Sequence, residues 1–311
     1  MCPYLLILRP MLSVTILGNN SAVPAFNRHP TSQVVTHDGA SYLVDCGEGT
    51  QIQMIKYKIR RGRISHVFIS HLHGDHYFGL VGLINTFGLL NHLQELHVFG
   101  PAPLQQIIEM QLNVSKNALP YPLHFHTITG NAILVDNEKI CIRAFKTDHR
   151  IECYGFTFEE KCGKRKLLID LVRKHKIPQS FYSSLQQGLD YITPRGGIVK
   201  NEAVTAAPER GRKYAFCADT RYSEDIIQDV YGFDTIYHES TYLDNMRDKA
   251  ADRYHSTAKQ AATIARKAMV NQLLIGHFSS KYATLDAFQH EAREIFGNTE
   301  LAIEGVTYEI H

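Results

Sequence analysis

No stretch of this 311-residue sequence approaches the about 18 consecutive apolar residues that a membrane-spanning helix needs. The longest early apolar run, Tyr4–Leu8, lies between two prolines and is too short for the hydrophobic region of a secretion signal. We therefore expect neither a membrane segment nor an export signal. Because Met11 directly precedes the first strand-like run, residues 1–10 are predicted to be a flexible N-terminal extension outside the fold.

The cysteines are few and widely separated, and no two of them form a Cys-x-x-Cys pair. This spacing excludes a zinc ribbon and a dense disulfide framework, and it favours a reducing, cytoplasmic compartment. Neither sign of charge is in excess, since 33 Lys and Arg stand against 31 Asp and Glu, a net charge of +2. Any argument for an anionic partner must therefore rest on local clusters. The cysteines are Cys2, Cys46, Cys141, Cys153, Cys162 and Cys217.

The sequence also contains no fixed-period repeat and no low-complexity tract, and its composition, 44% hydrophobic and 21% charged, is that of a globular protein. Strand-like runs alternate with helical patterns. The predicted fold class is a layered α/β protein with mixed strands, formed by a single domain over residues 11–311. The predicted strands are Ser13–Leu17, Gln33–Thr36, Ser41–Val44, His66–Ser70, Glu95–Phe99, Ile133–Val135, Ile140–Phe145, Tyr154–Glu159, Lys213–Cys217, Thr235–Tyr237 and Gln272–Ile275. The predicted helices are Thr50–Lys58, Tyr77–Leu90, Pro103–Asn113, Ser223–Tyr231, Thr257–Met269 and Thr284–Phe296.

One segment, residues 161–212, breaks this alternation. It begins with a basic cluster and continues as a stretch rich in Gly, Pro and Gln. Long irregular insertions in compact domains are usually functional or mobile. We interpret the segment as an insertion that leaves the core, rather than as a separate domain.

The strongest chemical signal is the string His-Leu-His-Gly-Asp-His at residues 71–76, between an apolar strand and an apolar helix. A tight loop at a strand end can direct residues i and i+2 at one ion and residues i+4 and i+5 at a neighbouring ion, because the glycine lets the backbone turn between the two pairs. Imidazole and carboxylate ligands suit Zn²⁺, Mn²⁺ or Fe. The structural alternative is a polar loop that caps the next helix, which would explain Asp75 but not three histidines.

Six residues cannot complete two metal sites, and three further candidates follow predicted strands: His149, Asp219 and His277. Taken singly, each has an ordinary explanation, as a loop histidine or as a turn or capping aspartate before Ser223. Taken together with the histidine-rich string, they are better explained as ligands, because open α/β sheets gather ligands at adjacent strand ends.

This pattern resembles the signature of the metallo-β-lactamase superfamily, a His-x-His-x-Asp-His string followed by a later His, an Asp and a final His. Within that superfamily the chain, from about Met11 to Tyr282, is similar to the ribonuclease Z family, whose members trim the 3′ trailer of precursor tRNA. The further strings that carry this similarity are Asp45–Gln51, His149 with Tyr154–Phe156, His238–Thr241 (a HEAT-type motif) and His255–Thr257 (an HST motif). The resemblance implies a four-layer αββα sandwich with a protruding arm insertion at about residues 161–212.

The resemblance also implies a ligand set for two divalent ions per chain, with Zn²⁺ as the expected metal and Mn²⁺ or Fe as alternatives. The implied ligands are His71, His73 and His149 for one ion, Asp75, His76 and His277 for the other, and Asp219 as a bridge between them. Asp45, Glu48 and Thr50 are expected to shape their loop and support these ligands by hydrogen bonds.

The resemblance assigns the chemistry to a hydroxide activated by the two metal ions, which hydrolyses the phosphodiester after the discriminator nucleotide and leaves a 3′-hydroxyl on the tRNA. Asp75 would orient the attacking water or accept its proton. His255, oriented by Glu239, would donate a proton to the leaving oxygen. The structural alternative for His255 is a capping segment, since Ser256 or Thr257 can cap the next helix, and both roles are compatible.

The implied partners are precursor tRNA and a second copy of the chain, in a homodimer in which one subunit's arm holds tRNA for the other's active site. Basic clusters supply candidate phosphate contacts. These are Arg60 and Arg61, for which a solvated helix end is the alternative, and Lys164, Arg165 and Lys166 at the start of the insertion. The arm departs from the family pattern, because residues 177–182 replace its Gly-Pro-rich tip, and residues 24–28 are an imperfect version of the family's early proline and arginine loop.

Two other functions compete with this interpretation. A different hydrolase of the same fold, such as a phosphodiesterase, lactonase or thioesterase, needs only the 71–76 string and Asp219, and the HEAT-type and HST motifs argue against it. The second competing function is that of an RNA-binding scaffold that has lost catalytic activity. The complete set of candidate metal ligands argues against this function.

Overall fold

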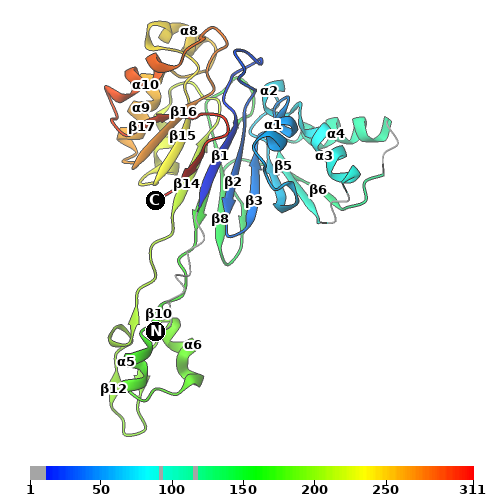
Figure 1. Ribbon diagram of the computed structural model, residues 1–311. Coiled ribbons are helices and arrows are strands. Elements are labelled where there is room, and N and C mark those ends of the chain that lie inside the picture. Colours follow the sequence, from blue (N-terminus) through cyan, green and yellow to red (C-terminus); the bar gives the residue numbers. More distant parts are fainter. Residues whose placement is uncertain (1–11, 91–93, 115–117) are drawn as a thin grey trace. The chain divides into compact units, whose positions relative to one another are not determined.

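The computed structural model of this chain describes residues 12–90, 94–114 and 118–311 (Figure 1). The predicted extension at residues 1–10 lies outside the described residues. The chain forms two compact units, which we describe separately. The first comprises the described residues up to Asp136 together with Cys141–Phe158 and Arg212–His311, and the second comprises Asn137–Ile140 and Glu159–Gly211.

The first unit contains two mixed sheets. In the first sheet the strands lie in the order β18-β1-β2-β3-β4-β5-β6, antiparallel from β18 to β3 and parallel from β3 to β6. Helices α1, α3 and α4 pack on its outer face. The strands are β1 (Ser13–Gly18), β2 (Ser32–His37), β3 (Ala40–Val44), β4 (Ile64–Phe68), β5 (Leu96–Gly100), β6 (Leu123–Thr127) and β18 (Thr307–Glu309), and the helices are α1 (Thr50–Lys56), α2 (Gly74–Tyr77), α3 (Leu80–Leu89) and α4 (Pro103–Val114).

The second sheet has the strand order β17-β16-β15-β14-β9-β8-β7, with β14 to β17 parallel. Helices α7, α9 and α10 cover its outer face. The strands are β7 (Ala132–Asp136), β8 (Ile140–Lys146), β9 (Tyr154–Glu160), β14 (Lys213–Cys217), β15 (Thr235–Glu239), β16 (Gln272–Gly276) and β17 (Thr299–Leu301). The helices are α7 (Ile227–Val230), α8 (Arg247–Asp252), α9 (Ala258–Lys267) and α10 (Asp286–Arg293).

The alternation of side chains along β4 explains why the layers stack. Val67 points to the outer face and joins the cluster beneath α3 and α4. Its neighbour Phe68 points to the other sheet, where its ring lies 5.5 Å from that of Phe156 and 5.9 Å from that of Phe158, centroid to centroid. Helices therefore cover both outer faces of two sheets that pack against each other, which confirms the predicted four-layer αββα sandwich.

The central strands of the second sheet are buried on both faces. β15 is buried at every position, and β14 and β16 are buried at all but their first residue, as expected for parallel strands covered on both sides. Because β14, β15 and β16 are parallel, their carboxyl ends lie at one edge of the sheet. The loops at 218–222, 240–246 and 277–285 begin there.

The second unit has a small core of its own, formed by Val172, Ile177, Leu185, Val199 and Val204. It contains two-stranded ladders of β10 with β13 and of β11 with β12. Its elements are β10 (Lys166–Leu167), α5 (Ile169–Lys174), α6 (Tyr182–Gln186), β11 (Tyr191–Ile192), β12 (Ile198–Val199) and β13 (Thr205–Ala206). This unit occupies the part of the sequence interpreted above as an insertion, and the role of that insertion as an arm stays a prediction.

The structure adds elements that the sequence patterns did not predict. Strand β6 was missed although His124 and His126 alternate with apolar residues, a pattern typical of a strand. Strands β17 and β18 were missed because each has only three residues. A strand this short is stabilised by its neighbours rather than by its own pattern.

Two of the expected absences can be examined over the part of the chain that the structure describes. No helix there is long and apolar enough to cross a membrane. The five cysteines described are free, four of them buried and Cys162 exposed. Cys2 lies outside the described residues.

Candidate active site

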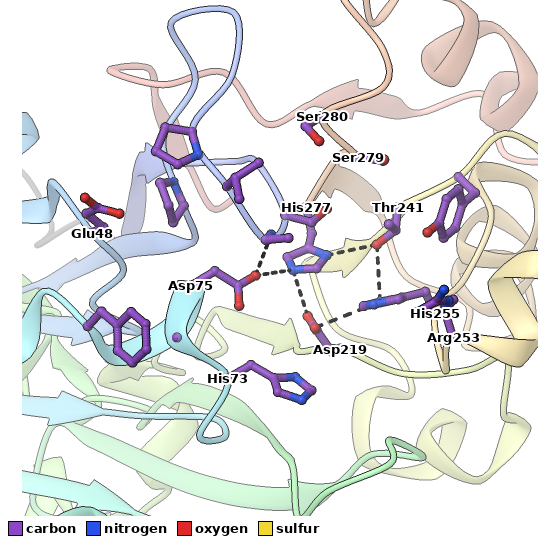
Figure 2. Close-up of a pocket in the computed structure, with 18 of the residues that line it drawn as sticks. Glu48, His73, Asp75, Asp219, Thr241, Arg253, His255, His277, Ser279 and Ser280 are labelled. Atoms are coloured by element: carbon purple, nitrogen blue, oxygen red, sulfur yellow. Dashed lines mark hydrogen bonds and ion pairs between the residues drawn. The ribbon is translucent and has the colours of Figure 1, made fainter. Parts of the chain in front are cut away.

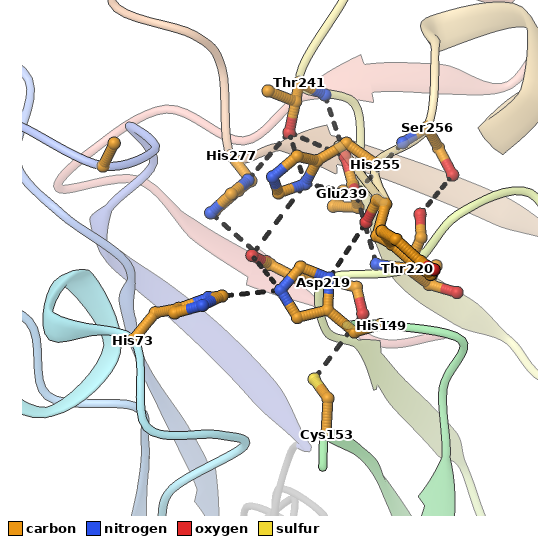
Figure 3. A network of polar contacts seen from close by, with 12 residues as sticks. His73, His149, Cys153, Asp219, Thr220, Glu239, Thr241, His255, Ser256 and His277 are labelled. Carbon is orange, nitrogen blue, oxygen red and sulfur yellow. Dashed lines mark hydrogen bonds and ion pairs between the residues drawn. The ribbon is translucent and has the colours of Figure 1, made fainter. Parts of the chain in front are cut away.

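Loops at the carboxyl ends of strands bring the predicted ligands to one place (Figure 3). The loop after β4 leads into the short helix α2, and the loops after β8, β14 and β16 approach it from the other sheet. The side chains that these segments contribute are His71 and His73 from the loop, Asp75 and His76 from α2, His149 after β8, Asp219 after β14 and His277 after β16.

The first group of ligand atoms comes from His71, His73, His149 and Asp219. Nδ1 of His73 lies 2.9 Å from Nε2 of His71 and 3.1 Å from Nε2 of His149. Oδ2 of Asp219 lies 3.6 Å and 4.0 Å from the same two Nε2 atoms. Ring nitrogens that converge on one point with a carboxylate form a set of donors suited to a divalent ion.

The second group comes from Asp75, His76 and His277, together with the other oxygen of Asp219. Oδ2 of Asp75 lies 3.5 Å from Nε2 of both histidines. Oδ1 of Asp219 lies 3.5 Å from Nε2 of His76 and 3.2 Å from Nε2 of His277. Ligand atoms about 2.0–2.1 Å from a tetrahedral ion are about 3.3 Å apart, so this spacing fits a bound metal ion.

The two buried Nε2 atoms of this second group, on His76 and His277, have no hydrogen-bond partner among the described residues. A buried ring nitrogen without a partner is costly, and a metal ion would satisfy it. Asp219 directs Oδ2 at the first group and Oδ1 at the second. The residues therefore fit two ions with a shared carboxylate.

The far nitrogen of each of three candidate ligand histidines is held by a hydrogen bond. Nδ1 of His76 lies 2.7 Å from Oδ2 of Asp45, Nδ1 of His277 lies 2.9 Å from Oγ1 of Thr241, and Nδ1 of His149 lies 3.0 Å from the carbonyl oxygen of Tyr254. Such contacts fix the ring orientation and leave the Nε2 lone pair facing the site. Asp45 occupies the supporting position expected from the sequence.

We expect Asp45→Asn to weaken metal binding by about 10–100-fold, because the buried carboxylate that orients His76 is replaced by a neutral amide. A metal titration of the purified variant measures this affinity. Asp190→Asn, at a half-buried carboxylate paired with Lys200 and outside the ligand groups, is the matched control. Equal affinities for Asp45→Asn and the unmodified protein would contradict the supporting role.

The electrostatics of the ligands favour the forms that bind metal. Burial lowers the pKa of His71 well below its usual range, and burial with His149 lowers that of His73 to about 4. Burial opposes ionisation of Asp219, but His277 and His76 hold its pKa well below the ordinary value. Neutral imidazole and ionised carboxylate are the states required for coordination.

His76 is the exception among these histidines. Burial lowers the pKa of His76, but the surrounding carboxylates, Asp219 first, outweigh it and raise the pKa well above the usual value. The three carboxylates around His76 are Asp219, Asp75 and Asp45. Their gathered negative charge favours the binding of metal cations at this site.

Glu239, at the end of β15, is completely buried and holds the side chain of His255 (Figure 3). Oε1 of Glu239 lies 2.9 Å from Nδ1 of His255 and also accepts the backbone N–H of Ser256 at 3.0 Å. Burial disfavours the charged form of His255, but Glu239 outweighs it and raises the pKa of His255 to about 9. Thr257 separately caps α9 through a capping box, so the capping role of this segment belongs to Thr257.

Thr241 connects this pair to the metal-ligand group, and sequence reasoning missed it. Its hydroxyl lies 2.8 Å from Oε2 of Glu239 and 2.9 Å from Nδ1 of His277. The Thr241 hydroxyl can therefore accept the Nδ1–H of His277 while donating to Glu239. Its position inside the HEAT-type string was the only signal available in the sequence.

These side chains open into a cavity of about 640 Å³ (Figure 2). His73, Asp75, Asp219, His255 and His277 lie on its wall. Its remaining lining includes three cations that the sequence analysis did not single out. They are Arg150, Lys249 and Arg253.

The basic clusters proposed from the sequence as substrate contacts are not in this lining. Arg60 is exposed and Arg61 half-buried after α1. Lys164, Arg165 and Lys166 belong to the second unit, where Nε of Arg165 donates to Oγ1 of Thr205 at 2.8 Å. Their contact with a substrate stays a prediction.

Comparison with known structures defines the class of protein. The structure resembles that of the metallo-β-lactamase fold protein YhfI from Bacillus subtilis, with a TM-score of 0.70 over 97% of this chain and 100% of that one, at 17% identity. It also resembles human tRNase Z, short form, with a TM-score of 0.71 at 26% identity over 96% and 99% of the two chains. The chain is therefore a protein of the metallo-β-lactamase fold.

The sequence comparisons define the family. Residues 12–168 match the family model described as Anti-Pycsar protein Apyc1, a range that ends before Asp219 and His255. The chain is 39% identical to ribonuclease Z of Bacteroides fragilis (strain YCH46) over 293 residues, which cover 94% of this chain and 96% of that relative. The chain belongs to the ribonuclease Z family, which confirms the family predicted from the motifs.

Proposed function

We propose that this chain is an endoribonuclease that removes the 3′ trailer of precursor tRNA by hydrolysing the phosphodiester after the discriminator nucleotide. The observation that carries this proposal is the Glu239–His255 pair beside two ligand groups that share Asp219. An acid–base pair next to a metal centre is the arrangement that phosphodiester hydrolysis needs. Membership of the ribonuclease Z family supplies the substrate class.

The ligands assigned from the sequence are the ones we propose for two divalent ions. His71, His73 and His149 would hold one ion, Asp75, His76 and His277 the other, and Asp219 both. When bound, two such ions lower the pKa of water and neutralise the charge that develops on the phosphoryl oxygens. We propose Zn²⁺ as the metal, and elemental analysis of the purified protein distinguishes it from Mn²⁺ or Fe.

The chain's own residues supply the proton transfers. Water attacks phosphorus, the P–O3′ bond breaks, and its electron pair goes to O3′ of the discriminator nucleotide. His255 gives O3′ a proton from Nε2, since its Nδ1 is held by Glu239. Asp75 orients the water and accepts the proton that the water loses on attack, and the backbone N–H of Ala22 donates to the Asp75 carboxylate at 2.7 Å.

The remaining partner assignments belong to the same proposal. The proposed substrate is precursor tRNA. Its phosphates would be bound by Lys164, Arg165 and Lys166 in the arm, and by Arg60 and Arg61. A homodimer and a cytoplasmic location stay predictions of the family resemblance. Sedimentation of the purified protein measures the first, and fractionation of cells the second.

The match of residues 12–168 to a different family model keeps one alternative open, another metallohydrolase of the same fold. A lactonase or thioesterase would need the ligand groups but not the Glu239–His255 pair, and a phosphodiesterase could use both on a substrate other than tRNA. Turnover of a chromogenic phosphodiester, compared with a lactone and a thioester, separates these activities.

Incubation of the purified, metal-loaded protein with a 3′-extended tRNA transcript tests the proposed function. We expect one cut after the discriminator nucleotide, which leaves a 3′-hydroxyl on the tRNA and a 5′-phosphate on the trailer. Mapping both new ends by sequencing and phosphatase sensitivity measures this. No cut, or cuts scattered through the trailer, would contradict the proposal.

A further inference from the structure

Positively charged side chains gather beside His255. One of them, Arg253, is labelled next to His255 in Figure 2. Lys249 comes from α8 and Arg253 from the residue after it, and both line the cavity. Lys281 follows Ser279 and Ser280, which line the cavity as well. We call these three residues, Lys249, Arg253 and Lys281, the cation cluster.

Interactions with Tyr242 and between the lysines place the cluster in one small region. Nζ of Lys249 lies 5.9 Å from the centre of the Tyr242 ring. The positive charges of Lys281 and Arg253 both act on the phenol of Tyr242. The close approach of Lys281 is the main cause that lowers the pKa of Lys249, and Arg253 adds to this effect.

Over the residues that the structure describes, no acidic side chain pairs with any member of the cation cluster, in contrast to other cations on the surface. Arg247 on the same helix is 2.9 Å from Asp244, and Lys259 on α9 is 2.8 Å from Glu294. Like charges gathered without a counter-charge repel one another, and an anionic ligand removes that repulsion. The cluster therefore has the properties of an anion site at the edge of the cavity.

We propose that Lys249, Arg253 and Lys281 bind the phosphate on the 5′ side of the discriminator nucleotide, and so hold the mature end of the tRNA rather than the trailer. This inference rests on the proposed function. His255 protonates O3′ of the discriminator, so that nucleotide must lie against His255. The ring of Tyr242 lies 6.3 Å from the ring of His255, centroid to centroid, and Arg253 precedes His255 by two residues.

The chemistry of the three side chains suits this ligand. A guanidinium can form two parallel hydrogen bonds with phosphate, and lysines add point charges. The phosphate next to the scissile one is fixed relative to O3′ by the sugar between them. Binding it therefore positions the reacting phosphodiester as well as adding affinity.

A charge-neutralisation experiment tests the proposal. A precursor tRNA is prepared with one uncharged methylphosphonate linkage on the 5′ side of the discriminator nucleotide. The unmodified protein and the Lys249→Gln/Lys281→Gln variant are compared on this substrate and on the all-phosphate substrate. We expect the neutral linkage alone, or the variant alone, to lower kcat/KM at least about tenfold, and the combination to lower it no further.

The salt dependence gives a second readout. For the all-phosphate substrate, the slope of log kcat/KM against log salt should become shallower by at most about 1 in the two-lysine variant, because the cation cluster neutralises one phosphate. Arg266→Gln, at an exposed arginine on α9 outside the cavity lining, should leave the slope unchanged. Metal content and thermal unfolding of each variant check that the fold is retained.

The possible failures can be told apart. Independent, multiplicative losses from the variant and the neutral linkage, or a neutral linkage that costs the unmodified protein nothing, would overturn this inference and leave the proposed function intact. A second substrate carries its neutral linkage at the first phosphodiester of the trailer beyond the cut. If only that linkage lowers kcat/KM, the cation cluster lies on the trailer side and this inference is overturned as well. An unmodified protein that fails to cut any 3′-extended tRNA would overturn the proposed function and this inference together.

Discussion

Asp219→Asn is expected to remove both metal ions and to lower cleavage of a 3′-extended tRNA by about 10³-fold or more. The reason is that the two carboxylate oxygens serve different ligand groups. Oδ2 faces His71 and His149, whereas Oδ1 faces His76 and His277. An asparagine keeps the volume of the buried side chain but offers one neutral oxygen, so neither group retains an anionic ligand from this position.

Elemental analysis after dialysis measures the first effect, and single-turnover cleavage the second. His73→Ala is the informative comparison, because His73 belongs to one group only and is half-buried. It should lose one ion, keep the fold and lose cleavage. Asp190→Asn, a carboxylate of the second unit, should change neither quantity. An Asp219→Asn protein that keeps two ions would contradict the shared role of this carboxylate.

The ligand set was predictable from the sequence because its members have local signals. The string at residues 71–76 compresses four of them into six positions, and His149, Asp219 and His277 each follow a recognisable strand. Parallel strands end at a common edge, which places Asp219 after β14 near His277 after β16, whereas the 71–76 string follows a strand of the other sheet. That they lie close together in the structure agrees with this expectation, and their occupancy by metal stays a prediction.

The contacts that join separate loops could not be predicted in the same way. Thr241 meets His277 because the segments after β15 and β16 run side by side, and no spacing in the sequence encodes a distance of 2.9 Å between those side chains. The cation cluster was missed for the same reason, since Lys249 and Lys281 are far apart in sequence. Searching for runs of basic residues found Arg60 and Arg61, and Lys164, Arg165 and Lys166, instead.

The second unit shows why hydrophobic periodicity does not predict very short helices. Its helices α5 and α6 have six and five residues, too short for an apolar repeat to stand out from chance. Its core consists of single apolar residues contributed by several short elements. Such a unit is stabilised by contacts within it rather than by propensity, so composition alone indicated an irregular segment.

His255→Ala is expected to lower kcat by about 10²–10⁴-fold while both metal ions stay bound, because it removes the proton donor for O3′ and no metal ligand. The geometry makes this distinction testable, since Asp219, His255 and His277 could also form a ligand group. Nδ1 of His255 lies 2.9 Å from Glu239 but 3.9 Å from Asp219, which favours the role of a proton donor. Loss of metal from His255→Ala would contradict that assignment.

The pH dependence of cleavage by Glu239→Gln tests whether His255 is the group that donates the proton to O3′. Glu239 raises the pKa of His255 to about 9 against the opposing effect of burial. His255 is therefore protonated and able to donate below about pH 9, and it loses this proton above that pH. Removing the carboxylate charge lowers the pKa of His255 and should move the alkaline limb of the kcat/KM profile to lower pH. Gln keeps a side-chain oxygen that can accept the Nδ1–H, which separates loss of charge from loss of position. An alkaline limb that stays in place in Glu239→Gln would mean that a group other than His255 supplies the proton to the departing tRNA end.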